Sequence, residues 1–90
     1  MKLTVEEFIW PDWVVEKILD KHGVDPGEVE QVFFNPPYKV RRSSSGKYLL
    51  YGRTEAGRFL CIVFAGEERA VKVISARDMA PAERRYLIGR

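Results

Sequence analysis

Near its C-terminal end the chain passes directly from a strand-like pattern into a helix-like one, over residues 69–86. The first part is rich in β-branched residues at 71–74 with basic residues among them, which favours a strand. In the second part Pro81 suits the first turn of a helix, and Asp78 or a residue shortly after it is the N-cap. The fold must therefore combine a sheet with a helix that follows it, and Arg77 lies at the junction.

Two further helices are predicted in the first third of the chain. The first opens at Pro11 or Asp12 and ends at Gly23, since glycine tolerates the left-handed conformation that follows a last helical turn. The second is capped by Asp25, with a proline in its first position and Glu28 as the partner in a capping box. The letters N-P-P that follow stop this helix.

Most of the remaining chain reads as short strands separated by turns. Gly57 fits the positive-φ position of a hairpin turn at 54–57. We expect an α+β fold in one domain, residues 1–90, with two N-terminal helices packed on an antiparallel sheet of three to five strands, and a short C-terminal helix. The expected strands are Lys2–Ile9 and Tyr38–Arg42 at edges, Lys47–Arg53 and Arg58–Phe64 as a hairpin, and Arg69–Arg77.

Composition argues against several classes of protein. No apolar run reaches the roughly 18 residues of a membrane span, and Glu6 and Glu7 stand where a signal peptide would be apolar. We therefore expect a cytoplasmic protein without a membrane segment. The one cysteine, Cys61, lies among apolar strand residues, so we expect a buried structural thiol rather than a nucleophile.

Charge is divided unevenly along the sequence. Residues 1–37 hold three basic and eight acidic residues, whereas residues 38–90 hold twelve basic and five acidic residues, so the net charges are −5 and +7. A surface that collected the later basic residues would attract a polyanion such as nucleic acid. The alternative is that these charges merely solvate a small domain, because a basic segment alone is weak evidence.

Arg77 is the strongest single candidate for binding a phosphate. A strand-end arginine has little rotamer freedom and its planar fork suits two phosphate oxygens, although an ion pair with Asp78 or with a carboxylate of an early helix is the alternative. Arg53 and Arg58 flank the predicted hairpin turn and are either phosphate ligands, or solvated strand ends, or ion-pair partners of Glu55. His22 is either a proton-transfer group or a last-turn residue that favours the helix dipole.

The C-terminal helix carries a third group of candidates, Arg84, Arg85 and Tyr86. They are either exposed helix residues or RNA contacts, the arginines at phosphates and the tyrosine at a base. Because neighbouring helical residues lie about 100° apart, one of the two arginines must point away from the sheet. Nothing in the sequence resembles a metal site or a nucleotide-binding loop, so no cofactor is expected.

The order of short motifs along nearly the whole chain resembles that of the BrnT family. The resemblance implies a bacterial type II toxin of RelE-like fold that inhibits translation by cutting RNA and is held inactive by a DNA-binding antitoxin, BrnA. The motifs are Trp10 with Asp12, K-H-G-V at 21–24, E-Q-V-F-F-N at 30–35, Y-G-R-T at 51–54 with Gly57 and Arg58, I-S-A-R at 74–77, and E-R-R-Y at 83–86.

The activity implied by the resemblance is a metal-independent endoribonuclease, acting on RNA that is free or bound to the ribosome. Attack by the 2′-hydroxyl needs a proton acceptor, cations that stabilise the phosphorane and a donor for the leaving oxygen. With one histidine, a two-histidine mechanism is impossible within a protomer. The expected catalytic residues are Arg77, Arg53 and His22, and the expected RNA-binding residues are Lys39, Arg41, Arg42, Arg58, Lys72, Arg84, Arg85 and Tyr86.

The expected protein partner is a BrnA-like antitoxin of the ribbon-helix-helix class. The alternative to a toxin is a non-catalytic module of RelE-like fold that binds a partner protein or RNA. A third interpretation is a homodimer, either through the open face of the sheet or within a toxin–antitoxin complex.

Overall fold

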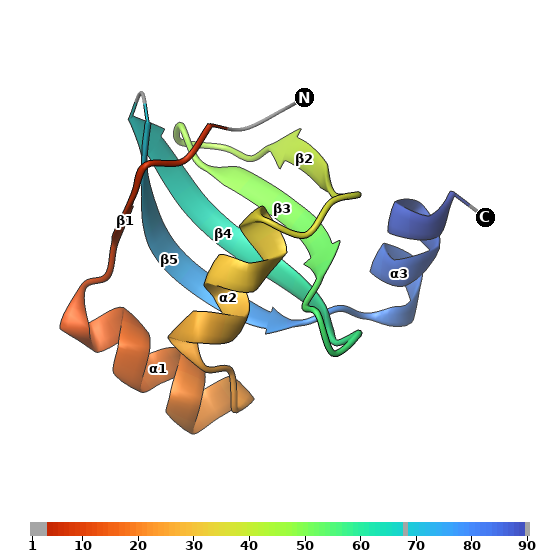
Figure 1. Cartoon of the computed structure of the whole chain (residues 1–90), viewed down its shortest axis with the longest axis horizontal. Helices are drawn as coiled ribbons and strands as arrows, with labels where there is room; N and C mark the ends of the chain where they lie inside the picture. Colours follow the sequence, from red (N-terminus) through yellow and green to blue (C-terminus); the bar gives the residue numbers. More distant parts are fainter. Residues whose placement is uncertain (1–3, 68, 90) are drawn as a thin grey trace.

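The computed structural model describes residues 4–67 and 69–89, and it combines helices with one five-stranded sheet (Figure 1). The strands lie in the order β1-β5-β4-β3-β2. The predicted mixed α+β class is therefore confirmed. In chain order the elements are β1 (Glu7–Ile9), α1 (Asp12–His22), α2 (Pro26–Phe33), β2 (Lys39–Arg42), β3 (Tyr48–Arg53), β4 (Phe59–Glu67), β5 (Ala70–Asp78) and α3 (Pro81–Ile88).

The sheet is antiparallel from β2 to β5 but mixed at its β1 edge. There β1 runs parallel to β5, with Phe8 opposite Val71, so the prediction of a wholly antiparallel sheet is wrong at this edge. Side chains alternate in the same way in both kinds of strand, and no hairpin turn joins β1 to β5, so nothing local fixes their relative direction. The predicted first strand began at Lys2, and Lys2 and Leu3 lie outside the described residues.

The strands β4 and β5 pair over a greater length than predicted. β4 continues to Glu67 and β5 runs from Ala70 to Asp78, so the expected connection at 65–68 is mostly strand. A register shift between Val63 and Phe64 interrupts the pairing. The bulge adds one residue to β5 and shifts its side-chain alternation there. Gly66 and the two glutamates after it are of types uncommon in strands, which is why the sequence suggested an earlier turn.

The helix ends follow local rules. Gly23 adopts φ 60° and ends α1, as predicted. The backbone N–H of Asp25 donates to the Glu28 carboxylate at 3.0 Å, and the capping box of α2 is formed. The N-cap of α3 is Ala80, whereas Asp78 remains in β5, so the later of the two predicted helix starts is the observed one.

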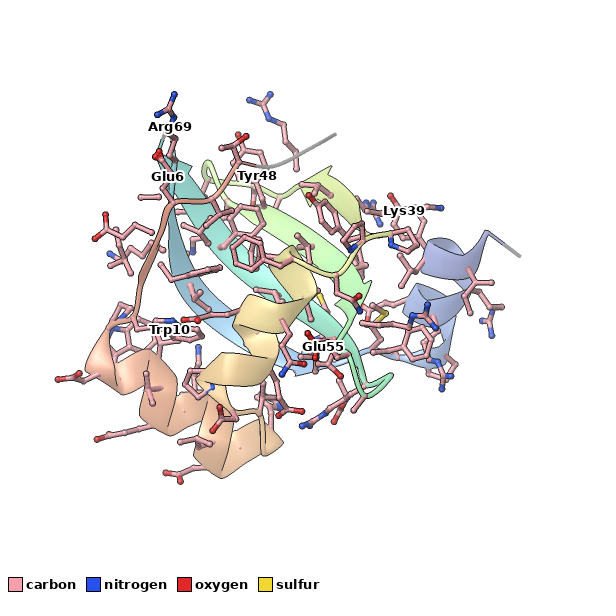
Figure 2. The ribbon with its side chains drawn as sticks, in the orientation of Figure 1. Glu6, Trp10, Lys39, Tyr48, Glu55 and Arg69 are labelled. Carbon is pink, nitrogen blue, oxygen red and sulfur yellow. The ribbon has the colours of Figure 1, made fainter. Side chains whose placement is uncertain are left out.

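The main core lies between the sheet and the helices α1 and α2, and Figure 1 shows α2 in front of the strands. β3 approaches α2 closely at Gly52, where an added Cβ would lie 2.6 Å from Val32 Cγ1. Trp10 Nε1 donates to Glu30 at 2.8 Å and ties the start of α1 to α2; Figure 2 labels this indole. The buried side chains of this core include Val14, Ile18, Val29, Val32, Phe33, Leu50, Leu60, Ile62, Phe64 and Val73.

A smaller buried cluster lies on the opposite face of the sheet, beneath α3. Cys61 is 1% exposed within it, which confirms the predicted buried thiol. α3 has no buried side chain of its own, so polar and aromatic contacts contribute much of its attachment. None of the helices in the described ranges is long and apolar enough to cross a bilayer. The cluster consists of Tyr51, Cys61 and Met79, with Leu49, Phe59 and Leu87 packed against them.

Candidate functional site

Strand register places one row of side chains across four strands on the face beneath α3. In this row Lys39 lies opposite Tyr51, Tyr51 opposite Cys61, and Cys61 opposite Arg77. Directly opposed residues share a face of a sheet. We call the surface formed by this row, its same-face neighbours Arg41, Arg53 and Phe59, and Arg84 and Tyr86 of α3, the α3 face.

Arg77 is held on the α3 face by a two-pronged ion pair with α3. Its Nη1 and Nη2 donate to the two oxygens of Glu83 at 2.7 and 2.8 Å, and Nη1 also donates to the Asp78 carbonyl at 3.1 Å. The paired guanidinium lowers the pKa of Glu83, and the carboxylate raises the pKa of Arg77. Glu83 also accepts the Ala80 N–H at the start of α3, so it joins that helix to β5. The Arg77 side chain nevertheless remains 44% exposed.

Tyr86 gathers two cations of β2 against α3. Lys39 Nζ donates to the Tyr86 carbonyl at 2.6 Å and lies 4.7 Å from the ring centroid, and Figure 2 shows Lys39 beside α3. The Arg41 guanidinium lies 5.3 Å from the same centroid. The Tyr86 ring in turn meets Tyr51 edge-on at 5.3 Å. These contacts keep positive charge close to the surface of an aromatic cluster.

Phe59, at the neighbouring end of the sheet, also has two cations close to its ring. The guanidinium carbons of Arg84 and Arg53 lie 4.3 and 5.6 Å from its ring centroid. Arg84 therefore faces the sheet, whereas Arg85 is exposed and forms no ion pair with the described residues. Within the described ranges, the cations that form no ion pair on the α3 face are Lys39, Arg41, Arg53 and Arg84.

Two of the titratable groups beneath α3, the Tyr51 hydroxyl and the Cys61 thiol, ionise less readily because they are buried. Burial raises the pKa of the Tyr51 hydroxyl and the pKa of the Cys61 thiol. A thiol with a raised pKa stays protonated at neutral pH and is a poor nucleophile. Cys61 is therefore part of the packing, and the chemistry available on this face comes from its cations and from exposed Tyr86.

Arg58, in contrast, belongs to a separate structural clamp. Its guanidinium donates to Asp78 Oδ1 and Oδ2 at 2.8 and 3.1 Å and to Glu28 Oε1 at 3.0 Å. It also donates to the carbonyls of His22 and Gly23 at the end of α1, at 3.0 and 2.9 Å. The pairing raises the pKa of Arg58 and lowers the pKa of Asp78. This clamp joins α1, α2 and β5 and leaves the group no N–H for a phosphate.

The remaining predicted residues lie outside the α3 face. His22 is half-buried at the end of α1, where its carbonyl meets Arg58. Lys72 lies opposite Ile9 and Ala65 toward the β1 edge, and Arg42 is exposed at the end of β2. The structure thus brings together Lys39, Arg41, Arg53, Arg77, Arg84 and Tyr86, and it does not place His22, Arg42, Arg58, Lys72 or Arg85 with them.

Glu83 and Phe59, which contact arginines of the α3 face, were not predicted from the sequence. Glu83 could have been noticed, because it sits three residues after the N-cap of α3 and reaches the start of the helix. Phe59 had a weaker signal, since it is one of several aromatic strand residues and only the register shows that Arg53 lies opposite it. No group of three or more His, Cys, Asp or Glu side chains in the described part of the chain is arranged to hold a metal ion.

Comparisons with known proteins agree with this architecture. The family model described as the ribonuclease toxin BrnT of type II toxin–antitoxin systems matches residues 10–83. The 1.1 Å crystal structure of the Brucella abortus ribonuclease toxin BrnT is similar, with a TM-score of 0.70 and 20% sequence identity over 84% of this chain and 99% of that one. At this identity the likeness shows a shared fold. The search of curated proteins found no match.

Proposed function

From the premise that the chain belongs to the BrnT family of ribonuclease toxins of type II toxin–antitoxin systems, we propose that it is a metal-independent endoribonuclease of RelE-like fold. It inhibits translation in the cytoplasm by cutting RNA that is free or bound to the ribosome. A BrnA-like ribbon-helix-helix antitoxin holds it inactive. The observation that carries the proposal is the gathering of Lys39, Arg41, Arg53 and Arg84 around Arg77 on one face without described carboxylate partners.

Phosphate binding follows from the chemistry of the α3 face. Guanidinium groups bind phosphate oxygens through pairs of N–H donors, and lysine adds a mobile point charge. Arg41, Arg53 and Arg84 are exposed and contact aromatic rings rather than carboxylates. When a phosphate takes the place of the aromatic ring at one of these arginines, no carboxylate has to be displaced. The free-energy cost of binding the phosphate is therefore small. The α3 face is therefore suited to the backbone of single-stranded RNA.

The reaction is an internal transesterification. The 2′-hydroxyl loses its proton to solvent, the 2′-oxygen bonds to the adjacent phosphorus, and the bond from phosphorus to the 5′-oxygen breaks as that oxygen takes up a proton. The products are a 2′,3′-cyclic phosphate and a 5′-hydroxyl. Arg77 and Arg53 stabilise the additional negative charge of the phosphorane, and the hydroxyl of exposed Tyr86 is the proton donor. The position of His22 at the end of α1 makes it the weakest of the catalytic candidates.

Arg77→Ala tests the proposal. Induced expression of the wild type should stop bacterial growth, and the purified protein in EDTA should leave cyclic-phosphate ends on RNA. Removing a charge-stabilising group typically lowers the rate about 100- to 1000-fold, and we expect a loss of this size in Arg77→Ala. Arg69→Ala is the matched control, because Arg69 is an exposed arginine with one ion pair, to Glu6. A wild type that neither stops growth nor cuts RNA contradicts the proposal.

The pairing of Arg77 with Glu83 favours one alternative, a non-catalytic module that binds RNA or a partner protein. An arginine whose fork already holds a carboxylate is less available to a phosphorane. RNA binding with a steep salt dependence but without cleavage would identify the RNA-binding module, because phosphate contacts release counterions. Salt-independent binding of protein alone would identify the partner-binding module.

A further inference from the structure

A hollow of about 380 Å³ lies beside Phe59, where α3 passes the ends of the strands. Its walls are Pro37, Arg53, Phe59, Leu87 and Ile88. Four of these five side chains are apolar, and the volume falls in the range of small-ligand sites, roughly 300–1,000 Å³. The hollow therefore offers apolar surface with a single cation, at the edge of the α3 face.

The charges around the hollow identify the kind of occupant. Arg53 lines it, Arg84 lies 4.3 Å from the centroid of its aromatic wall, and neither forms an ion pair with a described carboxylate. An apolar side chain of a partner protein would fill the walls but would gain nothing from two guanidinium groups. A nucleotide presents a flat ring together with negative phosphates, so it complements both features. Aromatic rings and guanidinium planes each stack with bases.

We propose that this hollow is a nucleobase subsite, in which one unpaired base of single-stranded RNA stacks against Phe59 while its flanking phosphates contact Arg53 and Arg84. The inference rests on the proposed function, because it assigns one part of the RNA substrate. Cys61 follows Phe59 by two residues and lies opposite Arg77, so strand geometry separates Phe59 and Arg77 by about 8 Å. A base held in the hollow therefore has its sugar-phosphate chain directed along the face that carries Arg77.

Binding of RNA that cannot be cleaved tests the subsite separately from catalysis. The probes are fluorescently labelled oligomers of eight uridines or eight adenosines with 2′-O-methyl groups, which have no 2′-hydroxyl to attack. Phe59→Leu removes the ring but keeps an apolar side chain, and it should weaken binding about 5- to 100-fold with an unchanged salt dependence. Phe59→Tyr keeps the ring and should bind as the wild type does. Phe34→Leu is the matched control, because Phe34 is 64% exposed and its ring contacts Phe8, away from α3.

An abasic nucleotide placed at each position of the oligomer in turn isolates the stacking contact. The wild type should lose affinity at one position, and Phe59→Leu should be insensitive there, since the two changes remove the same contact. Arg84→Gln provides a second variant on exposed α3 and should reduce the salt slope by about 0.7, the value for one phosphate of a single strand. These three results together would establish a base with a flanking phosphate in the hollow.

Several results would overturn the subsite. If Phe59→Leu binds RNA like Phe34→Leu while the wild type binds and cleaves, the subsite is wrong and the proposed function stands. If the wild type neither binds nor cleaves RNA, both the subsite and the proposed function are wrong. If Phe59→Leu binds RNA normally but no longer binds an antitoxin or a second copy of the chain, the hollow is a protein-docking site. Should Phe59→Leu not fold, an unchanged salt slope in Arg84→Gln, or a wild type indifferent to every abasic position, is decisive against the inference.

Discussion

Arg53 and Arg58 flank the same hairpin turn, yet the structure gives them opposite roles, so conservative changes at each should separate stability from RNA binding. Arg53 is exposed and its guanidinium contacts the Phe59 ring. We expect Arg58→Lys to destabilise the fold and Arg53→Lys to leave stability within about 0.5 kcal/mol of the wild type. The reason is that all N–H groups of Arg58 donate, to Asp78, Glu28, and the carbonyls of His22 and Gly23.

The size of the effect follows from exposure and geometry. A lysine offers three donors at a single point, so it cannot reach two carboxylates and two carbonyls together. Hydrogen bonds to charged groups contribute about 1.5–3 kcal/mol when buried. Here the side chain of Arg58 is 28% exposed and that of Asp78 is 61% exposed, so solvent screening limits the Asp78 share to about 1 kcal/mol or less. The carbonyls at the end of α1 add about 1 kcal/mol more, because a cation there also favours the helix dipole.

Thermal and urea unfolding measure this loss. A total of about 2 kcal/mol corresponds to a Tm lower by roughly 8–16 °C for a chain of this length. The pH dependence gives a second readout, since Arg58 holds the pKa of Asp78 below its usual value. The folded pKa is lower than the unfolded one, so this stabilisation is complete above about pH 4 and is lost as pH falls through the folded pKa. In Arg58→Lys that acid-dependent loss should be smaller.

The reasoning fails if Arg58→Lys melts within about 2 °C of the wild type and also loses RNA cleavage. Arg58 would then be a phosphate ligand, and its contacts with the helix carbonyls would be incidental. A large fall in the Tm of Arg53→Lys would contradict the other half of the comparison. The expected result is the reverse pattern, in which Arg58→Lys retains cleavage when assayed well below its Tm and Arg53→Lys is stable but binds RNA more weakly.

Two other changes test the packing of each face. Gly52→Ala should lower the free energy of unfolding in urea by about 1–3 kcal/mol, because its Cβ would lie 2.6 Å from a side chain of α2. Gly66→Ala is the control and should have little steric effect, since the nearest atom to its Cβ lies at 3.9 Å. Equal losses in the two variants would refute the clash. Glu83→Gln should weaken the attachment of α3 and speed labelling of the buried thiol of Cys61 several-fold. Glu6→Gln alters an exposed ion pair elsewhere and should leave the labelling rate unchanged. An unchanged rate in Glu83→Gln would show that apolar packing alone holds α3.

Local rules explain why parts of the fold could be predicted from the sequence. Gly23, Asp25 and Glu28 act within a few residues of themselves, so the helix ends they form are readable without the fold. The hairpin at 54–57 is similar, since Gly57 adopts φ 90°. The parallel pairing of β1 with β5 depends on contacts between distant segments, and no residue near either strand encodes it.

The types of residue in the candidate site could be predicted from the sequence, but which of these residues come together could not. The sequence indicated cations and a tyrosine, and register then decided which of them meet. Arg53 and Arg58 looked equivalent beside one turn, but Arg53 lies opposite Phe59 on the α3 face whereas Arg58 reaches Glu28 and the end of α1. The predicted ion-pair partner of Arg77, as the alternative to a phosphate, was Asp78 or a carboxylate of an early helix. It is Glu83 instead, because α3 folds back over the strand that precedes it.

The uneven charge along the sequence becomes a binding surface only where the fold separates cations from carboxylates. Acidic residues of the N-terminal part neutralise later arginines away from α3, as Glu28 does for Arg58 and Glu6 for Arg69. On the α3 face, the one ion pair among the described residues joins Arg77 to Glu83. A polyanion that approaches the molecule therefore gains most on that face, where it meets cations held against aromatic rings. It must also compete with Glu83 for Arg77, whose guanidinium already donates to both oxygens of that carboxylate.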